Sequence, residues 1–217
     1  MNRLLTLATR PRCFPALLLA LCAPVVPLQA QTLRITSPEN RSMVSPGQKL
    51  KVTVSESPSG AFRYVAVAGQ NPIGFGPGAK APPYELSVQI PARISPRLYA
   101  LTAVGIITPG HPIFSTPIMI DVERPDAPVR LDAEPSQLDL RIGVVGYIRV
   151  IGRFSDDPDV DLTQSTLTEY RSSALDVATV DKYGRVTGAA PGSAMITITN
   201  RGTTVVVPIT VTRRRES

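Results

Sequence analysis

Near its C-terminus the sequence reads Ser193-Ala-Met-Ile-Thr-Ile-Thr199 and then, after a short polar turn, Thr203-Thr-Val-Val-Val-Pro-Ile-Thr-Val-Thr212. Ile196 and Ile198 alternate with threonines, which places apolar side chains on one face and polar side chains on the other. That period of two is typical of a half-buried β-strand. The sequence therefore predicts two consecutive strands, over 193–199 and 203–212.

The same alternation recurs upstream, from Thr32 onward, between clusters of Pro, Gly, Ser and Asn. No stretch shows the 3.6-residue stripe of an amphipathic helix, so the pattern favours an all-β sandwich or barrel. The stretch 69–83 interrupts the alternation: it is too rich in Gly and Pro for a regular element and is expected to form a long surface loop. The other predicted strands lie within 49–54, 85–90, 118–122, 138–140, 148–154 and 175–180.

A proline-rich stretch, Arg124-Pro-Asp-Ala-Pro-Val129, divides this pattern into two similar halves. It is expected to be a stiff linker between domains at 31–123 and 130–212, followed by a basic tail at 213–217. Each half has the length and strand number of one immunoglobulin-like sandwich. We therefore predict an all-β chain of two tandem immunoglobulin-like β-sandwich domains that fold independently.

The second half resembles the bacterial Ig-like domain group 2, a family known from adhesins and other surface proteins. The resemblance covers 131–212 and implies a sandwich fold with a role at the cell surface. Its landmarks are Glu134-Pro-Ser-Gln-Leu138, Asp161-Leu-Thr163, Val177-Ala-Thr-Val-Asp181, Gly184-Arg-Val-Thr-Gly188 and Pro191-Gly-Ser-Ala-Met-Ile-Thr197.

The first half, 32–123, is more loosely similar to other bacterial Ig-like modules, through Ile35-Thr-Ser-Pro-Glu-Asn40 and Leu98-Tyr-Ala-Leu-Thr102. Such modules often have Gly before the tyrosine strand, where this chain has Arg97 and Leu98. Tyr99 is a candidate for the tyrosine corner of such folds, in which the hydroxyl group binds backbone a few residues upstream.

The N-terminal segment has the pattern of a secretory signal peptide over 1–30. Arg3, Arg10 and Arg12 precede an apolar run at 16–23, and the segment closes on Leu28-Gln-Ala30, after which we expect cleavage. The run is shorter than the roughly 20 residues of a membrane-spanning helix, which disfavours an uncleaved anchor. The bulky Leu21 likewise disfavours lipidation of Cys22.

Export places the mature chain in the periplasm, on the cell surface or in the medium, with no transmembrane segment. Both cysteines, Cys13 and Cys22, lie in the predicted signal, so the mature chain is expected to lack disulfides, cysteine-bound zinc and cysteine nucleophiles. Without 1–30, which hold three basic residues and no acidic one, 20 basic and 17 acidic residues remain, a formal charge of +3. This modest charge and the scarcity of aromatic residues argue against nucleic acid as a partner.

One cluster has metal-ligand character, the acidic run Ser155-Asp-Asp-Pro-Asp-Val-Asp161. Its carboxylates at 157, 159 and 161 alternate as in a calcium loop. However, Leu162 stands where the sharp turn needs Gly, and Thr168 stands where the closing Glu is expected. We favour a solvated turn at 156–161 over a calcium site, and both interpretations stay open.

Nothing else in the sequence predicts catalysis or a cofactor. His111, the single histidine, lies in a turn-like stretch with no nearby group to orient it as a base. Gly74-Phe-Gly-Pro-Gly78 superficially resembles a phosphate-binding loop, but the prolines that follow cannot start the helix that such a site needs. We predict no catalytic, cofactor-binding or metal-binding residues, and a chain that is not an enzyme.

Charge is unevenly distributed between the halves, with net +5 over 31–120 and net −1 over 126–217. Lys49 and Lys51 are expected to share the outward face of one strand. Such a face either attracts anionic polysaccharide or membrane headgroups, or serves only to keep the sheet soluble.

The function that these features favour is a non-catalytic, exported cell-envelope module, structural or adhesive, that contacts other envelope or extracellular proteins. The alternative is a ligand-binding accessory domain for an extracellular polysaccharide or peptide. Exposed aromatic residues in a cluster would favour this alternative, and the sequence does not reveal such a cluster.

Overall fold

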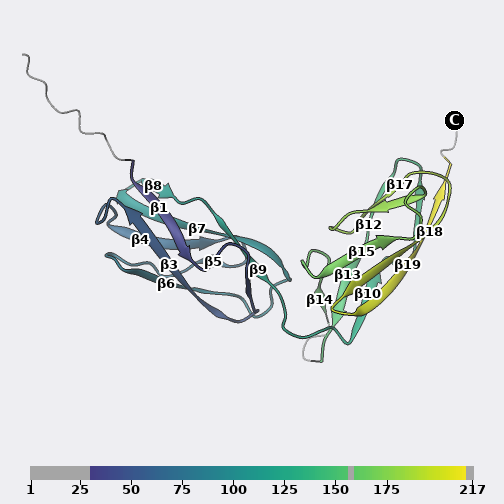
Figure 1. Ribbon diagram of the computed structural model, residues 1–217, viewed down its shortest axis with the longest axis horizontal. Helices are drawn as coiled ribbons and strands as arrows, with labels where there is room; N and C mark the ends of the chain where they lie inside the picture. The colour runs from purple at the N-terminus through teal and green to yellow at the C-terminus, as the bar shows by residue number, and fades with distance from the viewer. Residues whose placement is uncertain (1–29, 156–158, 214–217) are drawn as a thin grey trace, which may run out of the picture.

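The structure is a computed structural model that describes residues 30–155 and 159–213. Residues 1–29 of the predicted signal peptide, Asp156 and Asp157 of the acidic run, and most of the basic tail therefore lie outside the described residues. Within the described ranges every regular element is a β-strand, and the strands form two lobes that follow one another along the molecule's long axis (Figure 1). No helix in this part of the chain is long and apolar enough to cross a membrane.

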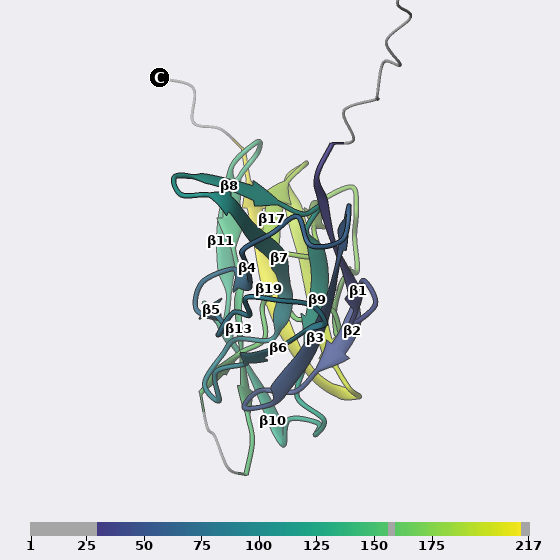
Figure 2. The ribbon, with the colours of Figure 1, turned by 90° about the vertical axis from the view of Figure 1, so that its left-hand side faces the viewer.

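The first lobe is a sandwich of two sheets, which Figure 2 views from its outer end. One sheet has the order β1-β3-β6, and the other has the order β2-β9-β7-β4-β5, with β8 pairing β7. All neighbours are antiparallel except β2 and β9, which run parallel. The strands are β1 (Thr32–Ser37), β2 (Ser42–Val44), β3 (Lys49–Ser57), β4 (Tyr64–Gly69), β5 (Gly74–Phe75), β6 (Tyr84–Gln89), β7 (Arg97–Thr108), β8 (His111–Phe114) and β9 (Ile118–Val122).

Period-two alternation builds the core of this lobe as predicted. Leu50, Val52 and Val54 of β3 are buried, whereas Lys49 and Lys51 point into solvent. The buried cluster draws on both sheets and extends from Leu33 to Val122. Because each strand contributes one apolar face, the sheets exclude water between them.

Tyr99 forms the predicted tyrosine corner. Its ring is 1% exposed, and its hydroxyl group donates a hydrogen bond to the backbone oxygen of Ser95 at 2.9 Å. The bond satisfies a buried hydroxyl group and fixes the chain where it enters β7. The corner therefore holds Ser95 and Arg97, which border the groove described below.

The expected loop at 69–83 is more ordered than predicted. Gly74 and Phe75 form β5 against β4, and Ala79 bridges Val65 through two backbone bonds of 2.8 Å. Glycine permits this close return, because a Cβ atom at Gly76 would lie 2.6 Å from the backbone oxygen of Ser87. The prediction of no regular element was thus wrong for β5.

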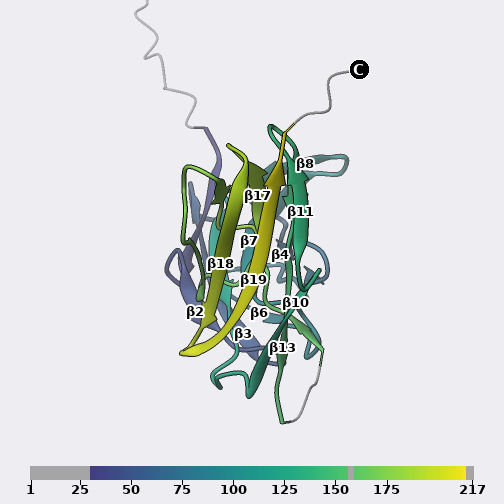
Figure 3. The same cartoon turned by 90° about the vertical axis from the view of Figure 1, so that its right-hand side faces the viewer.

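The second lobe is also a sandwich. A sheet of order β11-β19-β18-β15 packs against two small sheets, β10-β13-β14 and β12-β17-β16. Figure 3 shows β11, β19 and β18 side by side. The strands are β10 (Arg130–Glu134), β11 (Leu138–Arg141), β12 (Val145–Tyr147), β13 (Arg149–Arg153), β14 (Val160–Asp161), β15 (Thr168–Ser172), β16 (Ala178–Val180), β17 (Arg185–Gly188), β18 (Gly192–Asn200) and β19 (Thr203–Thr212).

The hairpin predicted from 193–199 and 203–212 is present as β18 and β19. Ile196 and Ile198 are fully buried, and the register pairs Ile196 with Val207 and Ile198 with Val205. The strand predicted from 175 begins later, at Ala178. Leu175 is 68% exposed, because a turn closed by the bond from Val177 N to Ala174 O precedes the strand.

Each lobe has its own buried apolar cluster, one over 33–122 and one over 131–211. The proline-rich stretch 124–129 connects them, and Pro125, Asp126 and Ala127 within it are exposed. We call the lobes the first and second sandwich. Domain bounds at 124–129 and independent folding remain predictions, to which the separate clusters lend support.

Candidate binding site at the joint between the sandwiches

A buried carboxylate lies where the two sandwiches meet. Glu123, directly after β9, is 3% exposed, and the Ser165 hydroxyl group donates to its carboxylate, with the hydroxyl oxygen 2.8 and 2.9 Å from the two carboxylate oxygens. The backbone N–H of Thr166 donates to the same carboxylate at 2.8 Å, and the Thr166 hydroxyl group donates to Asp121 at 2.7 Å. Side chains at the end of β9 thus bind the segment between β14 and β15.

This polar contact continues into the second sandwich. The side-chain amide of Asn200 donates to Ser165 at 3.3 Å and to Thr168 at 2.9 Å, and Thr168 donates to the Leu162 backbone oxygen at 2.8 Å. Burial raises the pKa of Glu123, although the hydrogen bonds from Ser165 and Thr166 act in the opposite direction. The joint is therefore held by a connected hydrogen-bond network around the Glu123 carboxyl group, whose ionisation is disfavoured by burial.

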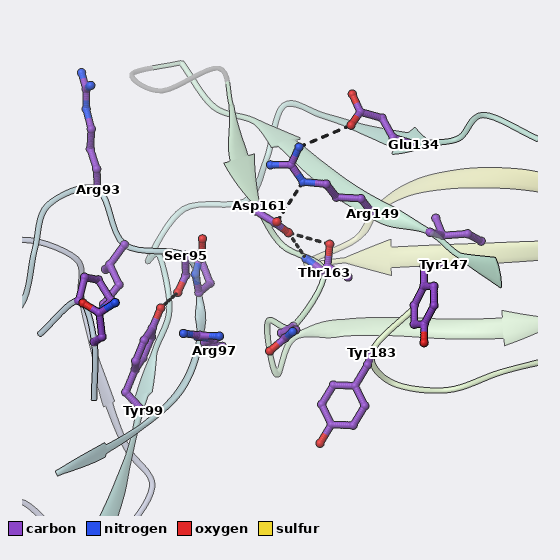
Figure 4. A pocket seen from close by; sticks show the side chains of 16 residues that line it. Arg93, Ser95, Arg97, Tyr99, Glu134, Tyr147, Arg149, Asp161, Thr163 and Tyr183 are labelled. Carbon is purple, nitrogen blue, oxygen red and sulfur yellow. Dashed lines mark hydrogen bonds and ion pairs between the residues drawn. The ribbon is translucent and has the colours of Figure 1, made fainter. Parts of the chain in front are cut away.

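A groove of about 640 Å³ lies beside this network and has one wall from each sandwich. Arg93 and Arg97 contribute to the wall of the first sandwich, and Tyr147 and Tyr183 contribute to the opposite wall (Figure 4). A hollow of about 430 Å³ adjoins it, because Arg97 and Tyr183 line both; it adds Arg41 and Lys182. We call the surface formed by Arg41, Arg93, Arg97, Tyr147, Lys182 and Tyr183 the joint groove.

Arg97 is the most enclosed cation of the groove. Its guanidinium group lies over the Tyr99 ring at 4.6 Å from the centroid, and its Nε atom is buried without a hydrogen-bond partner among the described residues. The side chain extends from the start of β7 toward the second sandwich, whereas Arg93 stands further out (Figure 4). Ring contact fixes the guanidinium group, and its terminal N–H groups, which have no hydrogen-bond partner among the described residues, are the donors available to a ligand.

The two tyrosines reach the groove from neighbouring segments. Tyr147 ends β12, where it pairs with Arg185 of β17, and Tyr183 lies in the turn between β16 and β17. Their exposed fractions are 65% and 53%. Asp181 holds this turn by accepting bonds from the Tyr183 and Arg185 N–H groups at 2.8 and 3.0 Å. The turn held by Asp181 therefore presents the Tyr183 ring beside the Tyr147 ring.

The remaining charges on the second wall neutralise one another. Arg149 donates to Asp161 at 3.0 Å and lies 3.6 Å from Glu134. Burial by itself raises the pKa of Asp161, but bonds from Thr163 and Arg149 outweigh it and lower that pKa below its usual value. Glu134 and Asp161 thus form their ion pairs and hydrogen bonds within the second sandwich.

The described part of the acidic run is engaged with arginines. Asp159 contacts Arg153, and Asp161 contacts Arg149. No group of three or more His, Cys, Asp or Glu side chains in the described ranges is arranged to hold a metal ion. Because Asp156 and Asp157 lie outside those ranges, weak or absent calcium binding at 156–161 stays a prediction.

The other sequence candidates lie apart from the joint or gain no partner that suggests catalysis. His111 is exposed at the start of β8. The Gly74–Gly78 stretch contains β5 and runs along β4. Lys49 and Lys51 share the outward face of β3 as expected, and Lys51 forms an exposed ion pair with Glu85 at 2.9 Å.

The sequence did not reveal the joint groove, because its residues are distant in the chain and meet only when the end of β9 contacts the segment between β14 and β15. It also revealed no cluster of exposed aromatic residues, whereas Tyr147 and Tyr183 form one. The sequence did contain one indication that Tyr183 is exposed. This tyrosine lies between Asp181 and Gly184, residue types that are typical of a tight turn.

Comparison with solved structures gives only weak similarities. The fibronectin(III)-like modules of Clostridium thermocellum CbhA are 14% identical, with 86% of this chain and 98% of that chain covered and a TM-score of 0.36. Domains 1–6 of the surface layer protein SbsC are 15% identical, with 86% of this chain and 28% of that chain covered and a TM-score of 0.35. TM-scores this low say nothing about the function of this chain.

A search of curated proteins found no match. The family model of the bacterial Ig-like domain (group 2) matches residues 152–211, from the end of β13 to the end of β19. This segment lies within the range 131–212 whose landmarks resembled the family, and it holds the hairpin and the Gly184 turn. The chain therefore carries a bacterial Ig-like domain of group 2 in its second sandwich.

Proposed function

We propose that this chain is a non-catalytic, exported module of the bacterial cell envelope, with a structural or adhesive role. The observation that carries the proposal is the family match over 152–211, since such Ig-like domains are typically not catalytic. The predicted signal peptide at 1–30 supports export, and its cleavage would leave the protein in the periplasm, on the cell surface or in the medium.

The partners that fit this role are other envelope or extracellular proteins. The outer face of the β18–β19 hairpin offers a contact surface, because Met195 and Val206 are 48% and 47% exposed there. Exposed apolar groups on a rigid sheet are typical of surfaces that bind proteins.

Site-specific cross-linking tests this role. A photo-crosslinking amino acid at Met195 is expected to trap an envelope or extracellular protein in cells that produce the chain. The same substitution at Gln70, in the first sandwich, serves as a control for random collisions. Equal trapping at both positions, or none at Met195, would contradict a role based on contacts of this face.

The alternative function, a ligand-binding accessory domain, gains one specific observation. Tyr147 and Tyr183 are exposed side by side in a groove that also holds cations. Pockets that combine ring faces with a few polar groups are typical of small-ligand sites.

A further inference from the structure

The joint groove concentrates positive charge that the protein does not neutralise. None of the described side chains forms an ion pair with Arg41, Arg93, Arg97 or Lys182, whereas Arg149 and Arg153 nearby are paired with carboxylates. Like charges close together repel one another, and a concave surface focuses their field. An anion that enters the groove would relieve this repulsion.

Arg97 fixes the position in the groove at which an anionic group would bind. It is half-buried, so it has lost part of its hydration, and its buried Nε atom lacks an acceptor among the described residues. A carboxylate in the groove can accept hydrogen bonds from the terminal N–H groups of Arg97, whose planar fork it matches, and so compensate for the lost hydration. The contact with the Tyr99 ring and the bond from Tyr99 to Ser95 hold the group in place before any ligand arrives.

The opposite wall offers ring faces rather than charge. Tyr147 and Tyr183 are exposed, and the Nζ atom of Lys182 lies 5.1 Å from the centroid of the Tyr183 ring. An exposed tyrosine presents an apolar face and a hydrogen-bonding hydroxyl group, which suits the C–H face and the hydroxyl groups of a sugar ring. An acidic peptide would satisfy the cations but would not need this platform.

We propose that the joint groove binds an anionic oligosaccharide, with a sugar carboxylate on Arg97 and sugar rings against Tyr147 and Tyr183. Arg41, Arg93 and Lys182 line the path of further acidic sugars. The proposal rests on the ligand-binding alternative above and names its ligand class. Because it needs both walls, it also requires the joint to stay closed through Glu123 and Ser165.

Calorimetry on the purified, full mature chain tests the ligand class. The probes are galacturonate oligomers, uncharged glucose oligomers of equal length, and an oligoglutamate peptide. The galacturonate oligomers are expected to bind at least about tenfold more tightly than either other probe, and binding should weaken as salt screens the cations. Equal binding of the glucose oligomers, or tighter binding of the peptide, would overturn the proposal.

Paired variants test the site. Arg97→Gln and Tyr183→Ala are each expected to weaken galacturonate binding by about tenfold, the equivalent of one good contact. Lys49→Gln removes the same charge on β3, and Phe114→Ala removes a ring that is 62% exposed and roughly 20 Å along β7 from Arg97. These controls should bind as the parent does. Equal losses in variants and controls would mean unspecific charge attraction and sink the proposal.

The melting temperature of each variant shows whether a loss of binding reflects misfolding. If Arg97→Gln unfolds early, a charge-retaining Arg97→Lys variant replaces it, which is expected to keep the fold and lose affinity because it lacks the planar fork. Binding at the wild-type level by that variant would count against the assignment of Arg97. Cross-linking at Met195 is independent of these variants, so failure of the glycan proposal and failure of the envelope role remain distinguishable.

Discussion

At the scale of single residues, Glu123 is where burial and charge oppose each other. Its raised pKa means that the folded protein disfavours the ionised carboxyl group. The protonated group therefore stabilises the folded protein relative to the ionised group. This contribution is fully present at pH values below the pKa that the group has in the unfolded chain. It is lost as the pH rises through the raised pKa of the folded protein.

The replacement Glu123→Gln removes that titration while keeping the shape. We expect the melting temperature of the parent to fall relative to that of the variant as the pH rises from about 4 to about 8. Calorimetric scans across this range measure the difference. A difference that stays constant with pH would show that Glu123 does not titrate against folding.

Tyr99→Phe isolates a single hydrogen bond. The variant loses the donor to the Ser95 backbone oxygen and leaves that oxygen without its partner, so we expect a loss of about 1 kcal/mol in the free energy of unfolding. Urea titration provides the measurement. Tyr183→Phe is the matched control, because this tyrosine is exposed, and it should change stability by less than about 0.5 kcal/mol.

At the scale of elements, the turn between β16 and β17 depends on Gly184. This residue has φ +73°, and a Cβ atom there would overlap the backbone oxygen of Ile148. Gly188, which ends β17, does not have a positive φ, so of the two glycines that flank residues 185–187 only Gly184 adopts the left-handed conformation. Glycine at 184 thus serves both backbone conformation and close packing.

Comparison of Gly184→Ala with Gly202→Ala separates the cost of backbone strain from the cost of the clash with Ile148. Gly202 also has a positive φ, at +88°, but no atom lies within 4 Å of the place that a Cβ atom would take there. We expect Gly202→Ala to cost about 1 kcal/mol, from backbone strain alone, and Gly184→Ala to cost at least about 1 kcal/mol more. Chemical denaturation of both variants checks this order. Equal losses would mean that the contact with Ile148 relaxes freely.

Strands with clear apolar alternation could be predicted from sequence, because burial of one face imposes a period of two that is visible in segments such as Lys49–Ser57 and Gly192–Asn200. Short or turn-bound elements could not. β5 forms because glycines let the chain return along β4, and Leu175 stays exposed because a turn delays β16. Both outcomes depend on backbone hydrogen bonds within tight turns, which apolar periodicity does not encode.

At the scale of the whole molecule, the joint groove is a property of the contact between the sandwiches. Arg97 and Tyr183 belong to separate segments, and no sequence pattern relates them. The prediction of two domains and the finding of a polar network at their joint are compatible, since a network around Glu123 holds two separate apolar clusters together.

Limited proteolysis tests this organisation. Cleavage is expected within 124–129, where Pro125, Asp126 and Ala127 are exposed, and should release two stable fragments. The 69–83 loop is a slower site, because β5 and the bridge from Ala79 to Val65 tie it to β4. Stable fragments that end inside 148–154 would refute the boundary, because that range contributes to the core of the second sandwich.

Fractionation with N-terminal sequencing tests most directly whether this chain works outside the cytoplasm as a binding module. In bacterial cells that produce it, the protein should begin at Gln31 and be recovered from the periplasm, the cell surface or the medium. Recovery from the cytoplasm with residues 1–30 still attached would contradict export, and with it the proposed role in the envelope.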